Sequence, residues 1–365
     1  MARLIAKVKS TPIDPLILSA KVASFKVHLT EAFKALDMAR SEGNAPRFLA
    51  ERGAVIPDFP NRDYWFLPDV QEELALLVAL INQEQPRDFV DFLYVVFSAI
   101  IITKGKTSVA NVMDLAHSRP HYRSSDGKTN AFERFMERLD KLTGDMMSFS
   151  SQLLDKRVNA RVVGVDARSL PIPDDSGFNF HFPPYVNAID YPRAHKFSIF
   201  WMPEYLGISS EEYKELGTEY IGTDRVPKSE CIERIENEFA IPILDSVIQE
   251  LADQDLKRAG VTHRYFDNML RAIAEMCQVV KPGRFTGIVV GPSRIKNIYV
   301  PTHQLLAEIS AQTTIVSKNK HYSFTVQDIY RRTIDDSKRQ LPYIRGEFGP
   351  GMRDEYVIIL QKRSG

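Results

Sequence analysis

The sequence predicts a mixed α/β protein in which a mainly helical region precedes an α/β region. Up to residue 155, apolar residues recur at helical spacing. From residue 156 to residue 365, short apolar runs alternate with helical patterns. Strands that alternate with helices favour a mainly parallel, doubly wound sheet. We therefore expect two domains, residues 1–155 and residues 156–365.

The helical region divides at Gly, Pro and Asn residues, which commonly mark turns. Its first helix is expected to stop before Thr11-Pro12, because a proline disfavours helix at the preceding residue. Residues 92–103 are the longest apolar run and are interpreted as part of a buried helix, since the run is too short to cross a membrane. Helices are expected over residues 2–9, 19–41, 70–82, 88–102 and 130–154.

The α/β region begins with two short apolar runs, residues 162–165 and 178–182, which we interpret as buried strands. A turn-rich stretch with two prolines, residues 171–176, separates them. The remaining strands are expected over residues 285–290, 324–329 and 356–361, and helices over 229–252, 262–280 and 301–311.

Composition places the chain among globular proteins, with 44% hydrophobic and 26% charged residues. Its two cysteines, Cys231 and Cys277, provide neither a disulfide framework nor a metal-ligand cluster. The start of the chain has no charged-then-apolar leader. A cytoplasmic protein without a bound metal and without a membrane span is the expectation.

Three segments carry the functional signal. Pro183-Pro184-Tyr185 directly follows an apolar run, so its two prolines would hold an aromatic ring on a stiff loop at the end of a strand. Upstream lies the run VVGVDA, residues 162–167, and downstream lies VKPGRF, residues 280–285. In this order the three segments resemble the amino-methyltransferases of DNA. The alternative for the tripeptide alone is a proline-stiffened surface turn.

The resemblance implies an S-adenosylmethionine-dependent enzyme with a Rossmann-like class I methyltransferase sheet. It implies that Asp166 and Ala167 bind the cofactor, the Asp166 carboxylate accepting a hydrogen bond from the adenine amino group. Tyr185 would stack on a base that has left the DNA duplex. Asn187, Asp190 and His195 would shape the base or cofactor pocket. The alternatives are an Asp166 that caps the following turn and a capped helix start after the loop.

Phe182 departs from the family pattern, which has Asp, Asn or Ser directly before Pro-Pro-Tyr. Phenylalanine cannot accept a hydrogen bond from the amino group of a base, so one of the groups that orient this nucleophile is missing. The catalytic segment, Phe182 to Tyr185, therefore leaves activity in question. Asn179 or His181 could substitute if the register shifts.

A second departure concerns the cofactor loop. The family has a Gly-rich loop after a strand, whereas no such loop occurs in this sequence, and Gly346-Glu347-Phe348-Gly349 comes too late and follows no strand. We therefore expect a split enzyme in which a second polypeptide supplies the Gly-rich half. A truncated copy is the alternative.

Charge bears on the expected partner, double-stranded DNA. The chain carries 47 basic and 47 acidic residues, so DNA must be held by a local patch or by a second chain. The best basic patch contains Lys104, Lys106, Arg119 and Arg123, for which a solvated loop is the alternative. Two functions stay open: a subunit of a DNA methyltransferase in restriction–modification or phage defence, and an impaired relative that binds DNA or scaffolds a partner.

Overall fold

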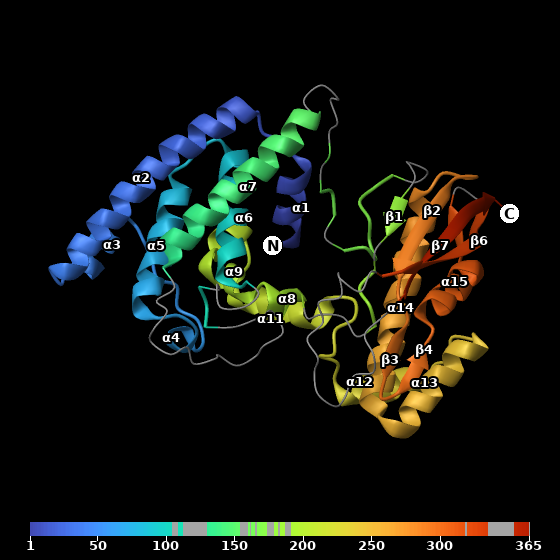
Figure 1. The fold of residues 1–365 in the computed structure, drawn as a ribbon. Coiled ribbons are helices and arrows are strands. Elements are labelled where there is room, and N and C mark those ends of the chain that lie inside the picture. The colour runs from blue at the N-terminus through green and yellow to red at the C-terminus, as the bar shows by residue number, and fades with distance from the viewer. Residues whose placement is uncertain are drawn as a thin grey trace. The chain divides into compact units, whose positions relative to one another are not determined.

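The computed structural model forms two compact units, each described here by itself (Figure 1). The helical unit comprises Met1–Val162 and Tyr191–Tyr213, and the sheet unit comprises Val163–Asp190 and Lys214–Gly365. Within these limits the structure describes residues 1–103, 109–111, 130–153, 160, 162–164, 166–173, 179–181, 183–186, 191–317, 320–334 and 354–364.

The helical unit confirms the helices that the sequence predicts for the first part of the chain. Asp14 begins the second helix, where its carboxylate accepts hydrogen bonds from the backbone N–H groups of Leu16 and Ile17. Short helices that the sequence analysis did not predict follow at several turns. The helices are α1 (Ala2–Ser10), α2 (Pro15–Ser41), α3 (Ala45–Glu51), α4 (Arg62–Trp65), α5 (Pro68–Asn82), α6 (Arg87–Ile101), α7 (Ala131–Leu153), α8 (Tyr191–Ala194), α9 (Lys196–Trp201) and α10 (Pro203–Leu206).

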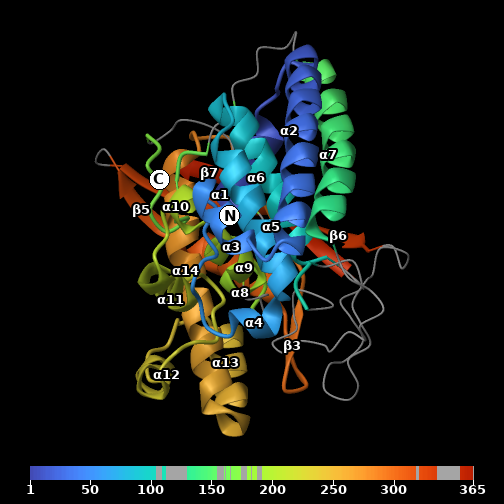
Figure 2. The same cartoon turned by 90° about the vertical axis from the view of Figure 1, so that its left-hand side faces the viewer.

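The core of this unit forms around α6, which is buried over most of its length as its apolar run predicts. Helices α2 and α7 lie side by side along the outside of the unit (Figures 1 and 2). Phe25 of α2 meets both Phe89 and Phe135 edge to face, with ring centroids 6.4 and 6.1 Å apart. Among the described residues, no helix combines the length and apolar character that a bilayer span requires.

A buried carboxylate joins three helices of the unit. Asp91 of α6 is only 3% exposed and accepts hydrogen bonds from Lys7 of α1 and from the hydroxyl of Tyr205 on α10. Arg87 lies 3.6 Å from the same carboxylate. Burial and the neighbouring Asp91 raise the pKa of Tyr205, so this phenol stays protonated and keeps donating.

Removing Asp91 should destabilise the helical unit. Asp91→Ala leaves the partly buried Tyr205 hydroxyl without its acceptor, and we expect a loss of about 1–3 kcal/mol. Asp88→Ala is the matched control, because Asp88 pairs with the same Lys7 at 3.2 Å but is half exposed, and it should cost about 0–1 kcal/mol. Tryptophan fluorescence during urea unfolding measures this, since Trp65 and Trp201 both lie in the helical unit. Equal losses for the two variants would contradict a structural role for Asp91.

The sheet unit contains a five-stranded sheet in the order β1-β2-β7-β6-β5. Strands β1 and β2 are parallel, whereas the β2·β7, β7·β6 and β6·β5 pairs are antiparallel. The prediction of a mainly parallel sheet is therefore wrong for the described strands, because β7 returns between β2 and β6. The strands are β1 (Asn179–His181), β2 (Phe285–Val290), β5 (Thr314–Ser317), β6 (Lys320–Thr333) and β7 (Asp354–Ser364).

Two of the three helices predicted for the sheet unit are found, the third is divided, and residues 210–219 form a helix that was not predicted. The single helix predicted over residues 229–252 is two helices, α12 (Lys228–Ile235) and α13 (Pro242–Gln254). Pro242 begins the second helix and forces Ile241 into an extended conformation, which interrupts the helical run. The other helices are α11 (Ser210–Glu219), which continues from the helical unit, α14 (Leu256–Val279) and α15 (Thr302–Gln312). A hairpin of β3 (Ser293–Ile295) and β4 (Ile298–Val300) completes the unit.

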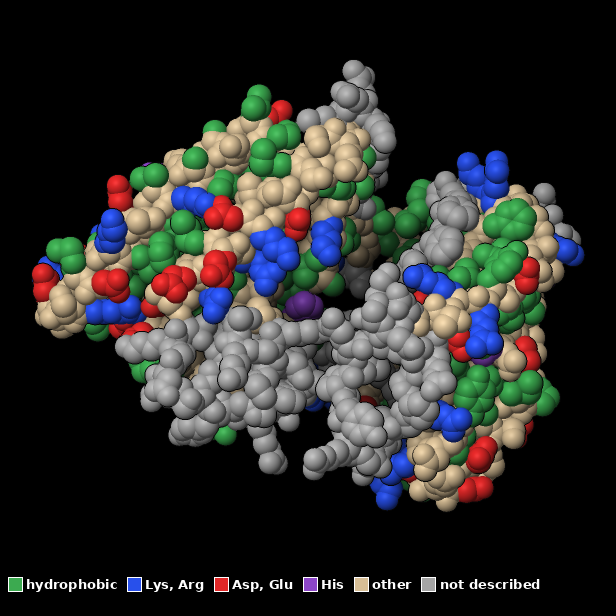
Figure 3. All heavy atoms as spheres, in the orientation of Figure 1, with side chains coloured by type: hydrophobic (Ala, Val, Ile, Leu, Met, Phe, Trp, Pro, Cys, Tyr) green, Lys and Arg blue, Asp and Glu red, His purple; other side chains and the backbone are tan. Residues whose placement is uncertain are grey.

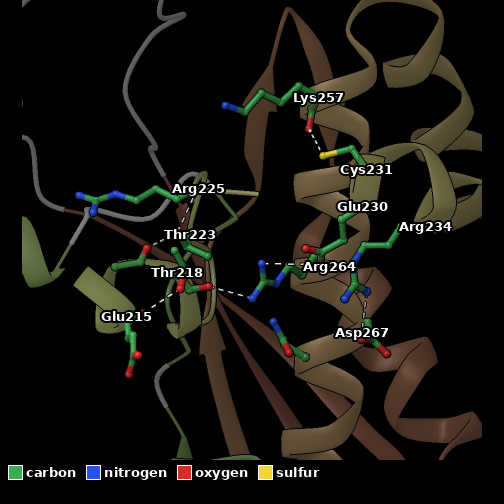
Figure 4. A network of polar contacts seen from close by, with 12 residues as sticks. Glu215, Thr218, Thr223, Arg225, Glu230, Cys231, Arg234, Lys257, Arg264 and Asp267 are labelled. Carbon is green, nitrogen blue, oxygen red and sulfur yellow. Dashed lines mark hydrogen bonds and ion pairs between the residues drawn. The ribbon is translucent and has the colours of Figure 1, made fainter. Parts of the chain in front are cut away.

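Helices α12 and α14 touch at a position where only glycine fits. A Cβ atom on Gly260 of α14 would lie 2.4 Å from Cβ of the buried Cys231 on α12. An ion-pair network surrounds this contact: Arg234 binds Glu230 at 2.8 Å and Asp267 at 3.3 Å (Figure 4). The network and the small residue together fix α12 against α14.

Adding a methyl group at Gly260 should loosen this contact. We expect Gly260→Ala to cost about 1–3 kcal/mol, because backbone and side-chain atoms of Cys231 block the space. The rate of thiol labelling measures this loss, because Cys231 and Cys277 are both buried in the sheet unit. Both thiols should react faster in Gly260→Ala than in the wild type. Gly144→Ala on α7, which has no atom within 4 Å of the new methyl group, should instead stabilise its helix by about 0.5–1 kcal/mol. An unchanged labelling rate for Gly260→Ala would contradict the tight contact.

Candidate active site

The predicted catalytic loop lies where the two parallel strands of the sheet end. His181 of β1 pairs with Ile288, and β2 continues to Val290. Strand β7 runs the other way and begins at this edge, because Tyr356 pairs with Val290. The loop that follows β1 therefore reaches the start of β7, which the sequence places 170 residues away.

Tyr185 makes this connection directly. Its hydroxyl donates a hydrogen bond to Glu355 Oε1 at 3.2 Å. Pro183 and Val186 are buried on either side, while Pro184 and Tyr185 are half-buried. The ring of Tyr185 packs against the hydrophobic core of the sheet unit. Two prolines, the packing and the hydrogen bond thus hold the ring in one place.

Glu355 also faces a basic side chain. Its other carboxylate oxygen, Oε2, lies 3.9 Å from Arg332 on β6. The neighbouring Arg331 pairs with Asp354 at 2.9 Å, so two consecutive arginines of β6 pair with two consecutive acidic residues of β7. Glu355 therefore accepts from Tyr185 while it stays ion-paired.

A second tyrosine lies beneath the loop. Tyr265 of α14 is fully buried, and its hydroxyl has no hydrogen-bond partner among the described residues. Burial, with a smaller contribution from Tyr185, raises the pKa of Tyr265. A buried hydroxyl without a partner is uncommon in folded proteins.

Asp166 lies in a turn, not at the end of a strand. Residues 162–164 are not a strand in the structure, and Val163 is 44% exposed, which corrects the prediction of a buried strand over 162–165 as far as these residues are described. The Asp166 carboxylate accepts a hydrogen bond from the backbone N–H of Arg168 at 2.9 Å and forms a two-pronged ion pair with its guanidinium. These bonds to Arg168 lower the pKa of Asp166, so the carboxylate is ionised at neutral pH.

One helix face connects Asp166 with Tyr185. Arg168 donates to Asn268 of α14 at 3.0 Å, and the backbone N–H of Leu170 donates to Glu275 of the same helix at 2.8 Å. Tyr265 precedes Asn268 by three residues and so shares its face. The Asp166 turn is thus bound to α14 through Arg168, and the same helix carries Tyr265, whose pKa the nearby Tyr185 influences.

The remaining predicted site residues either have no described contact with this face or lie outside the described part of the chain. Ala167 is half-buried within the Asp166 turn. His195 belongs to the helical unit, where burial and the amino group of Met1 lower its pKa, so its role beside Tyr185 stays a prediction. Phe182, Asn187, Asp190, Lys104, Lys106, Arg119 and Arg123 lie outside the described residues.

The turn cap at Asp166, which the sequence analysis gave as the alternative to cofactor binding, is present, since the carboxylate accepts from the backbone N–H of Arg168 two residues later. Sequence reasoning missed Asn268 and Glu355, because pairings across 100 and 170 residues leave no local pattern. Where the chain is described, no three His, Cys, Asp or Glu side chains gather as a metal site would require.

Comparison with known proteins gives one informative similarity. No protein-family model matches the sequence, and no solved structure matches it. The chain is similar to the type II methyltransferase M.MvaI of Kocuria varians, with 23% identity over 319 residues that cover 85% of this chain and 67% of that protein. The sequence is thus distantly similar, over most of its length, to a type II methyltransferase.

Proposed function

We propose that this chain is a subunit of a split, S-adenosylmethionine-dependent DNA methyltransferase that acts on the exocyclic amino group of adenine or cytosine, in restriction–modification or phage defence. The observation that carries the proposal is that α14 holds the Asp166 turn through Arg168 and Asn268 and also carries Tyr265 near Tyr185, whose loop follows the parallel strand β1. In α/β sheets, ligands bind beyond these strand ends. The distant similarity to a type II methyltransferase supports the same reading.

The residues around Asp166 fit the adenosine part of the cofactor. A carboxylate offers about four lone-pair positions, and Arg168 supplies three donor groups, its backbone N–H, Nε and Nη2. Asp166 is 39% exposed, so it can accept one further donor such as the adenine amino group. When bound, S-adenosylmethionine would supply the electrophilic methyl group.

Tyr185 would hold the target base. An enzyme that modifies a base takes it out of the duplex and stacks it on an aromatic ring. The hydrogen bond to Glu355 fixes the hydroxyl end of Tyr185, so one face of the ring can receive a base without reorganisation. Glu355 is therefore a positioning residue in this proposal.

Phe182 favours the second candidate, an impaired methyltransferase-like subunit that binds DNA or scaffolds a partner. The neutral amino nitrogen must direct its lone pair at the methyl group, which requires acceptors for its hydrogens. Main-chain carbonyl groups of the Pro183 loop can provide one acceptor, but a phenylalanine side chain provides none.

The need for a companion polypeptide rests on two features. The sequence contains no Gly-rich loop directly after a strand, and such loops allow a backbone to approach a cofactor closely. Among the described strands, β1 is at the edge of the sheet and pairs only with β2. An open edge can accept a strand from another chain, and this would complete a Rossmann-like class I sheet.

Cofactor binding should depend on the companion chain. We expect titration calorimetry to detect no saturable micromolar binding of S-adenosylmethionine to this chain alone, and micromolar binding once a polypeptide with a Gly-rich loop is added. Asp166→Asn in the complex should weaken that binding, because an amide presents one acceptor oxygen where the carboxylate presents two. Tight binding by the isolated chain would sink the split-enzyme proposal.

Phe182 should limit the rate of methyl transfer. A well-placed orienting hydrogen bond is worth about 10²–10³-fold in rate, so Phe182→Ser or Phe182→Asp should raise incorporation of radiolabelled methyl groups into DNA. Phe182→Leu is the control, since it changes size without adding an acceptor and should stay slow. High wild-type activity that Phe182→Ser reduces would show that another acceptor orients the amine. Absence of activity in every variant favours the impaired subunit.

A further inference from the structure

A hollow on the helical unit lies between the end of α6 and the first half of α7. Its volume is about 240 Å³, well above the ~10–15 Å³ that a cavity needs to hold one water molecule, so a phosphate group fits. Three of its side chains are basic and one is acidic. The lining residues are Ile100, Thr103, Arg134, Glu137, Arg138 and Lys141.

The three basic side chains form one stripe along α7. Arg134, Arg138 and Lys141 follow one another at spacings of four and three residues, which places them on the same helix face. Arg134 is neutralised by Glu137, whose Oε2 lies 2.9 Å away. Within the described part of the chain, Arg138 and Lys141 form no ion pair, although Arg138 is half-buried.

Many other basic side chains of the unit are ion-paired. Basic and acidic side chains are interspersed over the visible face of the helical unit in Figure 3. Most arginines with described contacts bind carboxylates, as Arg40 does with Glu72 and Arg47 with Glu51. A partly desolvated guanidinium that lacks such a partner favours an anion, and its planar donors suit phosphate oxygens.

We propose that this stripe binds the phosphate backbone of double-stranded DNA. The inference rests on the proposed function, because a chain with no net charge needs a local basic site to hold its substrate. Seven residues of helix rise about 10 Å, and successive phosphates of one strand advance about 3.4 Å along the duplex axis. The stripe can therefore contact at least two phosphates of one strand.

The salt dependence of duplex binding tests the proposal. We would measure binding of a fluorescent duplex by anisotropy, with the full chain, over a series of chloride concentrations. Each lost phosphate contact makes the slope of log affinity against log salt shallower by about 0.9. The double variant Arg138→Gln with Lys141→Gln should therefore lose about 1.8 from the slope.

Matched controls separate the stripe from total charge. Arg3→Gln with Lys34→Gln removes the same charge from exposed positions of the same unit outside the hollow and should change the slope by less than about 0.5. The charge-conserving pair Arg138→Lys with Lys141→Arg should keep the wild-type slope. Tryptophan fluorescence checks that each variant remains folded.

Several outcomes would overturn the proposal. Equal slopes for the two glutamine pairs would show a non-specific effect of charge, and absence of duplex binding by the wild type would refute the inference outright. Loss of binding confined to Arg119→Gln with Arg123→Gln would move the DNA site elsewhere. Stronger displacement by inorganic phosphate than by chloride at equal ionic strength would indicate a site for a small phosphate ligand.

Methyl incorporation separates this inference from the proposed function. If the complex methylates DNA and the stripe variant binds like wild type, the stripe proposal fails while the function stands. If binding follows the stripe but no variant transfers methyl groups, the function fails while the stripe stands.

Discussion

The burial of α14 against the sheet is the interaction on which the sheet unit and its candidate site both depend. Phe266, Met269 and Ile273 of this helix lie in the hydrophobic core without any exposure. The face that carries Asn268 and Tyr265 meets the Asp166 turn and underlies the Tyr185 loop. Since one rigid helix supports both loops, their separation is set by secondary structure, which is more precise than loop packing alone.

Contacts outside the loops themselves hold their polar groups in place. Arg168 is bound at one end by Asp166 and at the other by Asn268, so the turn cannot swing away from α14 without losing charge-assisted hydrogen bonds. Tyr185 is held in the same way by the core and by Glu355. A ligand that meets these groups would find them already oriented, and would therefore lose little free energy in ordering them.

The sequence predicted the elements whose signals are local and missed those set by distant partners. Strand β2 has the predicted bounds, and α6 differs from its prediction by a single residue at each end, because apolar periodicity and flanking prolines define them. The antiparallel return of β7 between β2 and β6 could not be predicted, since strand order depends on pairings across the chain. For the site, the residue types at Asp166 and Tyr185 were visible, but Asn268 and Glu355 were not, because only the fold brings them near.

The two units have separate cores, and this separation shapes how the proposed activity divides. No residue of the core around α6 belongs to the core around α14. Asp166 and Tyr185 lie in the sheet unit, whereas the basic stripe of α7 lies in the helical unit. The core residues of the two units are different, so the proposed base chemistry and the proposed backbone binding would rest on different sets of contacts. On this proposal, a substitution in the α7 stripe would change DNA affinity through charge and leave the packing of α14 in the sheet unit intact.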